Sequence, residues 1–199
     1  MATILLNGVA YDAANVTDDN DKLTFRGGSS DSLNVNLAGG DDLYEVDSEG
    51  EDITNATMRG GEGDDVVRVV SGDDDDFPSR SNIGGSLIGG PGSDLIALGD
   101  GLVSLTGTIK GNEDDDFITV AKANGGTIQG NQGDDTITLG FGRTDLNDPD
   151  SDRFSESAGS KATNSLKDAS VNGSKGEDTI FVRGGADINN STLRGNEGD

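Results

Sequence analysis

Pairs of acidic residues recur along this chain at one fixed place, directly after a glycine-rich turn and directly before a short apolar run. Counted from the first glycine of each turn, the pair occupies positions five and six. Position five is Asp64, Ser93, Asp115, Asp134 and Glu177, and position six is Asp65, Asp94, Asp116, Asp135 and Asp178. Carboxylates repeated in one register are candidate ligands for a hard cation.

Stacking these turns would place like charges close together. Two unit charges at strand spacing repel by ~1 kcal/mol in a water-like medium and by ~3.5 kcal/mol at an effective dielectric constant near 20. Calcium is the cation that fits best, because it takes six to eight carboxylate and carbonyl oxygens and because glycine lets carbonyls turn inward. The chain has no His or Cys, so zinc, copper and iron–sulfur sites lose their preferred ligands. The alternative is that Gly-Asp-Asp reflects turn propensity alone.

We therefore expect Ca²⁺ as the cofactor of this chain. Its predicted ligands are Asp64, Asp65, Asp94, Asp115, Asp116, Asp134, Asp135, Glu177 and Asp178.

The residues that flank the turns predict the elements that position them. Two places before each turn stands an apolar residue and three places before it a hydroxyl: the apolar set is Met58, Leu87, Ile109, Ile128, Val171 and Leu193, and the hydroxyl set is Thr57, Ser86, Thr108, Thr127, Ser170 and Thr192. After each turn, apolar residues alternate with variable ones, as in Ile118 and Val120. Period-two alternation on both sides of a tight turn predicts strand, turn, strand.

The spacing of the repeat predicts how these strands assemble. The basic unit is about 21 residues long, with insertions where the gap is larger, and one such unit cannot bury its own apolar side. Only 31% of the residues are hydrophobic, which is too few for an ordinary core of this size. We therefore expect an all-β fold, a parallel β-solenoid (β-roll or β-helix), with inward ladders of Ile, Val and Leu and a hydroxyl ladder outside.

The turns also resemble a known family. GGEGDDVVR at 60–68 and GGPGSDLIA at 89–97 match the nine-residue calcium-binding repeat of RTX, or haemolysin-type, proteins at every defining position. GNQGDDTIT, GSKGEDTIF and GNEDDDFIT match it with one or two substitutions, and Asp114 stands where the third of these copies should have its fourth-position glycine. The resemblance implies a right-handed parallel β-roll in which the sixth-position aspartate and turn carbonyls of neighbouring coils hold Ca²⁺.

One departure from the family pattern changes the expectation. RTX repeats run in tandem, whereas here a single nonapeptide is followed by about twelve residues of strand and connector. We therefore expect one acidic edge and one edge without metal. We expect residues 1–50 to form an N-terminal cap with degenerate first coils, and residues 51–199 to form the solenoid with insertions at 72–81 and 141–168. The turn at 195–199 stops before its strand, so we expect the solenoid to continue in a longer chain.

Charge and composition narrow the function. The formal charge of −24 argues against nucleic-acid partners and anionic membrane surfaces, and no segment is long and apolar enough to predict a membrane span. The N-terminus lacks the features of a signal peptide. Without His or Trp, and with no nucleophile and base in a shared register, we do not expect an enzyme.

The sequence therefore favours a calcium-stabilised extracellular or cell-surface protein with a structural or adhesive role, such as an S-layer, surface matrix or fibre component. The expected partners are calcium ions, further coils of the same chain or self-assembly, and a surface glycan. A virion component such as a phage fibre or tail decoration is the alternative. A polysaccharide-modifying β-helix enzyme is a more remote one.

Overall fold

The structure of the chain is a computed structural model that describes residues 3–6, 9–10, 12, 16–26, 34–47, 53–70, 81–98, 103–140, 165–182 and 187–197. All regular elements in these ranges are β-strands. Most of the two predicted insertions (72–80 and 141–164) and the truncated turn at Asp199 lie outside the described residues.

The strands form three sheets. The nine-stranded sheet contains β1 (Thr3–Leu6), β2 (Val9–Ala10), β3 (Lys22–Arg26), β5 (Leu43–Asp47), β7 (Val66–Val70), β10 (Leu95–Leu98), β13 (Phe117–Val120), β16 (Thr136–Leu139) and β19 (Thr179–Val182). The seven-stranded sheet contains β4 (Asn34–Asn36), β6 (Thr57–Arg59), β9 (Ser86–Pro91), β12 (Thr108–Glu113), β15 (Thr127–Gln132), β18 (Ser170–Lys175) and β21 (Thr192–Glu197). The five-stranded sheet contains β8 (Ser81–Ile83), β11 (Val103–Leu105), β14 (Ala123–Asn124), β17 (Ser165–Lys167) and β20 (Asp187–Asn189).

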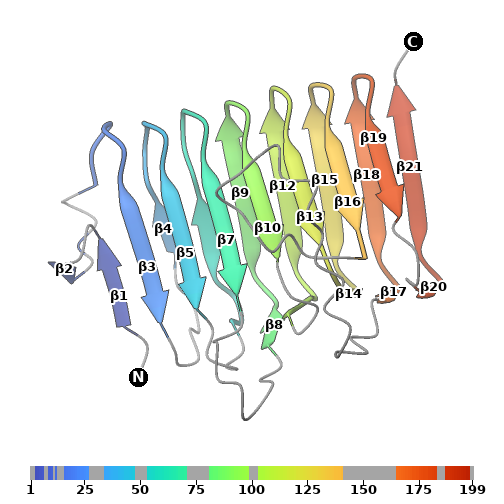
Figure 1. Cartoon of the computed structure of the whole chain (residues 1–199), viewed down its shortest axis with the longest axis horizontal. Coiled ribbons are helices and arrows are strands. Elements are labelled where there is room, and N and C mark those ends of the chain that lie inside the picture. The colour runs from blue at the N-terminus through green and yellow to red at the C-terminus, as the bar shows by residue number, and fades with distance from the viewer. Residues whose placement is uncertain are drawn as a thin grey trace, which may run out of the picture.

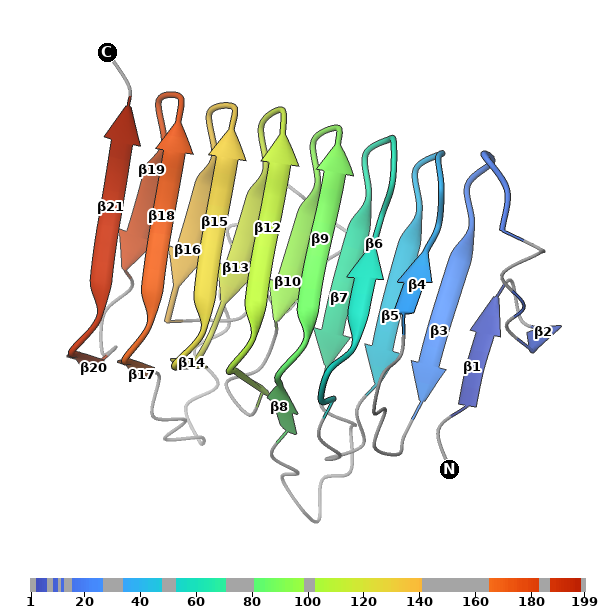
Figure 2. The same ribbon diagram turned by 180° about the vertical axis from the view of Figure 1, so that it is seen from behind.

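From β3 to β7 the chain alternates between the nine- and seven-stranded sheets, and from β8 onward each coil visits all three sheets, so equivalent strands of successive coils lie side by side (Figure 1). For example, β12 leads through an acidic turn to β13, and the chain then passes through β14 to β15, which pairs in parallel with β12. Figure 2 views the molecule from the opposite side, with the seven-stranded sheet in front, from β21 to β4. The predicted parallel β-solenoid is confirmed.

The core consists of the inward ladders that the repeat predicts. In the nine-stranded sheet Ile96, Ile118 and Ile137 pair in register, and all three are buried. In the seven-stranded sheet the equivalent ladder is Ile109, Ile128 and Val171, each 0% exposed. Each inward side chain therefore packs between its equivalents in the neighbouring coils, and the core grows one layer per coil.

The five-stranded sheet was not predicted, because only two strands per coil were expected. Its strands are two or three residues long, and four of the five contribute a buried apolar residue to the interior: Ile83, Leu105, Ala123 and Leu166. One inward residue per coil leaves no alternation for sequence reading to detect. The predicted insertions at 72–81 and 141–168 overlap two of these strands, because β8 begins at Ser81 and β17 lies before residue 168.

The two ends of the described stack differ. At the N-terminal end β1 pairs antiparallel with both β2 and β3, whereas every other strand pairing described is parallel. At the other end the ladder residues of the last coil are open, with Val182 39%, Ile188 45% and Leu193 37% exposed. The apolar core is therefore uncovered at the last described coil.

Candidate metal site: two carboxylate ladders on one edge

The Gly-Asp-Asp turns all lie on one long edge of the solenoid, where the seven-stranded sheet passes into the nine-stranded sheet (Figure 1). The fourth position of each turn has a left-handed backbone, with φ of 127° at Gly63, 125° at Gly92 and 125° at Gly133. Asp114 takes the same position with φ of 69°. Aspartate tolerates this region better than most residues, so the substituted turn still forms.

The sixth-position aspartates form a buried ladder. The backbone N–H of each donates to the side-chain Oδ1 of the equivalent aspartate in the next coil. Starting from Asp21, the acceptors in order are Asp42 (2.7 Å), Asp65 (2.9 Å), Asp94 (2.9 Å), Asp116 (2.9 Å), Asp135 (3.0 Å) and Asp178 (3.1 Å). Because the acceptor always belongs to the following coil, each of these carboxylates links two turns.

The second carboxylate oxygen of this ladder is buried without a partner. Six aspartates leave Oδ2 in this state: Asp42, Asp65, Asp94, Asp116, Asp135 and Asp178. Asp21, at the N-terminal end, differs because Thr17 N–H donates to its Oδ2 at 3.0 Å. Burying an ionised carboxylate oxygen that has no hydrogen-bond donor costs free energy. Each of these six aspartates is therefore expected to hold a proton or to contact a cation.

The first glycine of each turn makes room for this oxygen. A Cβ added to Gly60, Gly89 or Gly111 would lie within 1.8 Å of the Oδ2 of the sixth-position aspartate of the same turn. The same holds at Gly130 and Gly173, where that distance would be 1.8 and 2.1 Å. Glycine recurs here because the carboxylate occupies the space of a side chain.

Burial raises the pKa of five of these carboxyls far above the ordinary value of 3.8. Desolvation is the main cause, and neighbouring carboxylates add to it, while the backbone hydrogen bond to Oδ1 acts in the opposite direction. The resulting pKa is about 8 for Asp116, about 7 for Asp42 and Asp94, and about 6 for Asp65 and Asp135. Without metal, these five carboxyls hold protons at pH 5 and lose them as the pH rises through 6 to 8.

The fifth-position residues form a second, exposed ladder that runs the other way. Here the side chain accepts from the backbone of the following coil: Ser93 N–H donates to Asp64 Oδ1 at 2.8 Å, and Asp134 N–H donates to Asp115 Oδ1 at 2.7 Å. Glu177 N–H donates in turn to Asp134 Oδ1 at 2.8 Å. Each turn is thus tied to both of its neighbours by carboxylates, which is a structural reason for the acidic pair that requires no metal.

The predicted site residues therefore share one edge but occupy two environments. Sequence reasoning placed both positions on an acidic edge and missed the burial of position six. The ladders also extend toward the N-terminus beyond the predicted site residues, through Asp42 and Asp21 on one side and Asp41 and Asn20 on the other. The recurring first glycine was the sequence signal for this burial. Its φ is not left-handed, so glycine is needed there because the carboxylate occupies the space of a side chain.

The donor set permits calcium only in a mixed coordination. The described residues contain no group of three or more His, Cys, Asp or Glu side chains placed around one point. Besides the buried Oδ2, the turns offer the fourth-position carbonyls: those of Gly63 and Gly133 point at the fourth-position glycine of the next coil, 2.2 and 1.9 Å from where its Cβ would be. Carboxylate, carbonyl and water oxygens are the donor types of a normal calcium shell, and the turns supply the first two.

Comparisons with protein-family models, with curated proteins and with solved structures give no significant match to this chain. No helix long and apolar enough to cross a membrane occurs in the described ranges.

Proposed function

We propose that this chain is a calcium-stabilised structural or adhesive repeat protein of the extracellular space or cell surface, with turns that work like those of the RTX family. The observation that carries the proposal is the row of six buried carboxylate oxygens that have no hydrogen-bond donor. Calcium is the ion that these oxygens and the turn carbonyls suit best.

The physical role of calcium follows from the burial of the ladder. Without metal, the buried carboxyls keep their protons or carry closely spaced negative charges. A divalent cation at each turn replaces the protons and offsets the repulsion. Because the ladder exists only in the folded state, calcium binding stabilises that state by mass action. Such a protein folds where calcium is in the millimolar range, as it is outside cells.

A rigid stack of coils supports a scaffolding role better than a catalytic one. Among the described residues, the polar groups that the fold brings together are hydrogen-bonded ladders rather than a nucleophile beside a base. We propose further coils of the same chain, or another subunit, as the partner at the open coil around Val182, Ile188 and Leu193. A virion fibre or tail component would use the same architecture and remains the second candidate.

Direct calcium titration tests the proposal. We expect saturable binding of several ions, with magnesium a poor substitute because it demands a tighter octahedral shell. Asp135→Asn should weaken binding at the turns on both sides of its rung. Asp187→Asn, an equal charge change at an exposed residue of β20, should leave binding unchanged. Absence of binding at millimolar calcium, or equal effects of the two variants, would refute the metal site.

A further inference from the structure

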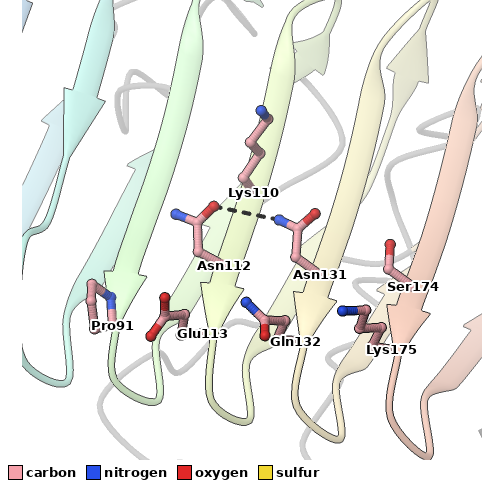
Figure 3. A pocket seen from close by; sticks show the side chains of 8 residues that line it. All are labelled: Pro91, Lys110, Asn112, Glu113, Asn131, Gln132, Ser174 and Lys175. Atoms are coloured by element: carbon pink, nitrogen blue, oxygen red, sulfur yellow. Dashed lines mark hydrogen bonds between the residues drawn. The ribbon is translucent and has the colours of Figure 1, made fainter.

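The outer face of the seven-stranded sheet carries a hollow that the carboxylate ladders do not explain. It has a volume of about 520 Å³ and spans β9, β12, β15 and β18, close to the turns. Figure 3 shows the side chains that line it, standing off one face of these strands. The register brings Asn112, Asn131 and Ser174 into one row across it.

This row has an unusual backbone for its residue types. Asn112, Asn131 and Ser174 have φ of 112°, 96° and 97°, in the region that favours glycine. Gly90, which pairs with Asn112 in the preceding coil, meets the same backbone requirement with glycine. Asn131 Nδ2 donates to Asn112 Oδ1 at 3.5 Å, which is at the limit of a hydrogen bond. Asparagine tolerates this region better than most residues, but Gly90 shows that the turn forms without a side chain at this place, which leaves the amides available to a ligand.

The charge of the hollow is opposite to that of the chain. Two lysines, Lys110 and Lys175, line it, together with a single carboxylate, Glu113. Among the residues whose side chains the structure describes, neither lysine has an ion-pair partner, and Lys175 stands in register with Glu197 of the next coil. The strands that carry them, β12 and β18, are two coil spacings or about 10 Å apart. This spacing suits an extended ligand with several anionic groups better than one compact anion.

We propose that this hollow binds an acidic oligosaccharide, a chain of sugars with carboxylate substituents. Asn112, Asn131 and Ser174 supply donors and acceptors for sugar hydroxyls, and Lys110 and Lys175 pair with the carboxylates. No aromatic side chain lines the hollow, so neither the stacking that holds neutral sugars nor the stacking that holds nucleic-acid bases is available. Apart from Lys110, the lining residues are second- and third-position residues of the turns that carry the carboxylate ladders, so the site lies beside those ladders and rests on the proposed calcium-stabilised fold.

The test is a calorimetric titration of the folded protein with tetragalacturonate at a fixed calcium concentration of about 1 mM. The methyl ester of the same oligosaccharide, which lacks the charges, serves as the control ligand. We expect saturable binding of the acid and at least about tenfold weaker binding of the ester. The double variant Lys110→Gln/Lys175→Gln should also bind about tenfold less tightly, because it removes two exposed charge pairs. Lys167→Gln, on the five-stranded sheet, should bind normally.

Asn131→Gly separates a binding role from a structural one. It keeps the backbone that Gly90 adopts, so its unfolding midpoint should stay near that of the parent while its affinity for tetragalacturonate falls. Absence of saturable binding, equal affinity for acid and ester, or unchanged binding by the double lysine variant would each overturn the proposal. A large loss of stability in Asn131→Gly with unchanged affinity would also overturn it, because the amides would then serve only to join coils. Circular dichroism of each sample distinguishes these results from a failure of calcium-dependent folding.

Discussion

Gly111→Ala is expected to cost roughly 3 kcal/mol or more of unfolding free energy, whereas Gly84→Ala is expected to cost little. A Cβ at Gly111 would lie 1.7 Å from Asp116 Oδ2 and 2.5 Å from its Cγ, while the nearest atom to a Cβ at the exposed Gly84 would be Thr106 Oγ1 at 3.4 Å. Asp116 would have to rotate away and abandon its hydrogen bond from Asp94 N–H. Neither glycine has a left-handed φ, so backbone strain does not separate the two variants.

Denaturant unfolding of both variants measures this difference, and a double-mutant cycle assigns its cause. If the clash with the carboxylate is responsible, Gly111→Ala should cost much less in an Asp116→Ala background, where the space is empty. Equal losses at Gly111 and Gly84, or a penalty that persists without the Asp116 carboxylate, would show that the first glycine serves the backbone rather than the ladder.

Asp116→Ala and Asp116→Asn are expected to have very different effects on the metal-free protein. Alanine removes the acceptor for the buried Asp94 N–H and leaves a void, which should cost about 2–4 kcal/mol. Asparagine keeps an oxygen at the Oδ1 position and removes the charge, so it resembles the protonated acid that the raised pKa of Asp116 favours. At pH 5 with chelator, where Asp116 holds its proton, Asp116→Asn should therefore stay within about 1 kcal/mol of the parent.

The same pair should respond differently to calcium. The parent should gain stability when calcium is added, and Asp116→Asn should gain less because an amide is a weaker calcium ligand than a carboxylate. If Asp116→Asn is as damaging as Asp116→Ala in chelator, the charge of Asp116 is needed even without metal. The description of the ladder as a row of neutral acids would then be wrong.

The sequence predicted the solenoid well because its evidence repeats. Ile109, Ile128 and Val171 share one place relative to the turn, and stacking turns this periodicity directly into a buried ladder. The third sheet escaped because its strands are only two or three residues long and share no sequence pattern from coil to coil, as VSL in β11 and SLK in β17 show. Periodicity can reveal a face only where several residues share it.

The site was only half predictable for a different physical reason. Sequence spacing showed that Asp94 and Asp116 occupy equivalent places, but it did not show which of the two acidic positions faces inward. That depends on the turn: the left-handed fourth position directs position six under the first glycine and position five to solvent. Asp64 and Asp65 are neighbours in sequence, yet Asp64 is exposed and Asp65 is 1% exposed.

Unfolding free energy as a function of pH, with calcium and with chelator, tests most directly whether the buried aspartates need a cation. Their pKa is raised to about 6 to 8 in the folded protein from the ordinary 3.8. The metal-free folded state therefore holds protons that the unfolded chain releases. This contribution is complete below pH 4 and is lost as the pH rises through 6 to 8. With chelator, stability should fall from pH 5 to pH 8 by about 2 kcal/mol or more. With calcium it should stay level or rise, and coincident curves at pH 8 would contradict the account.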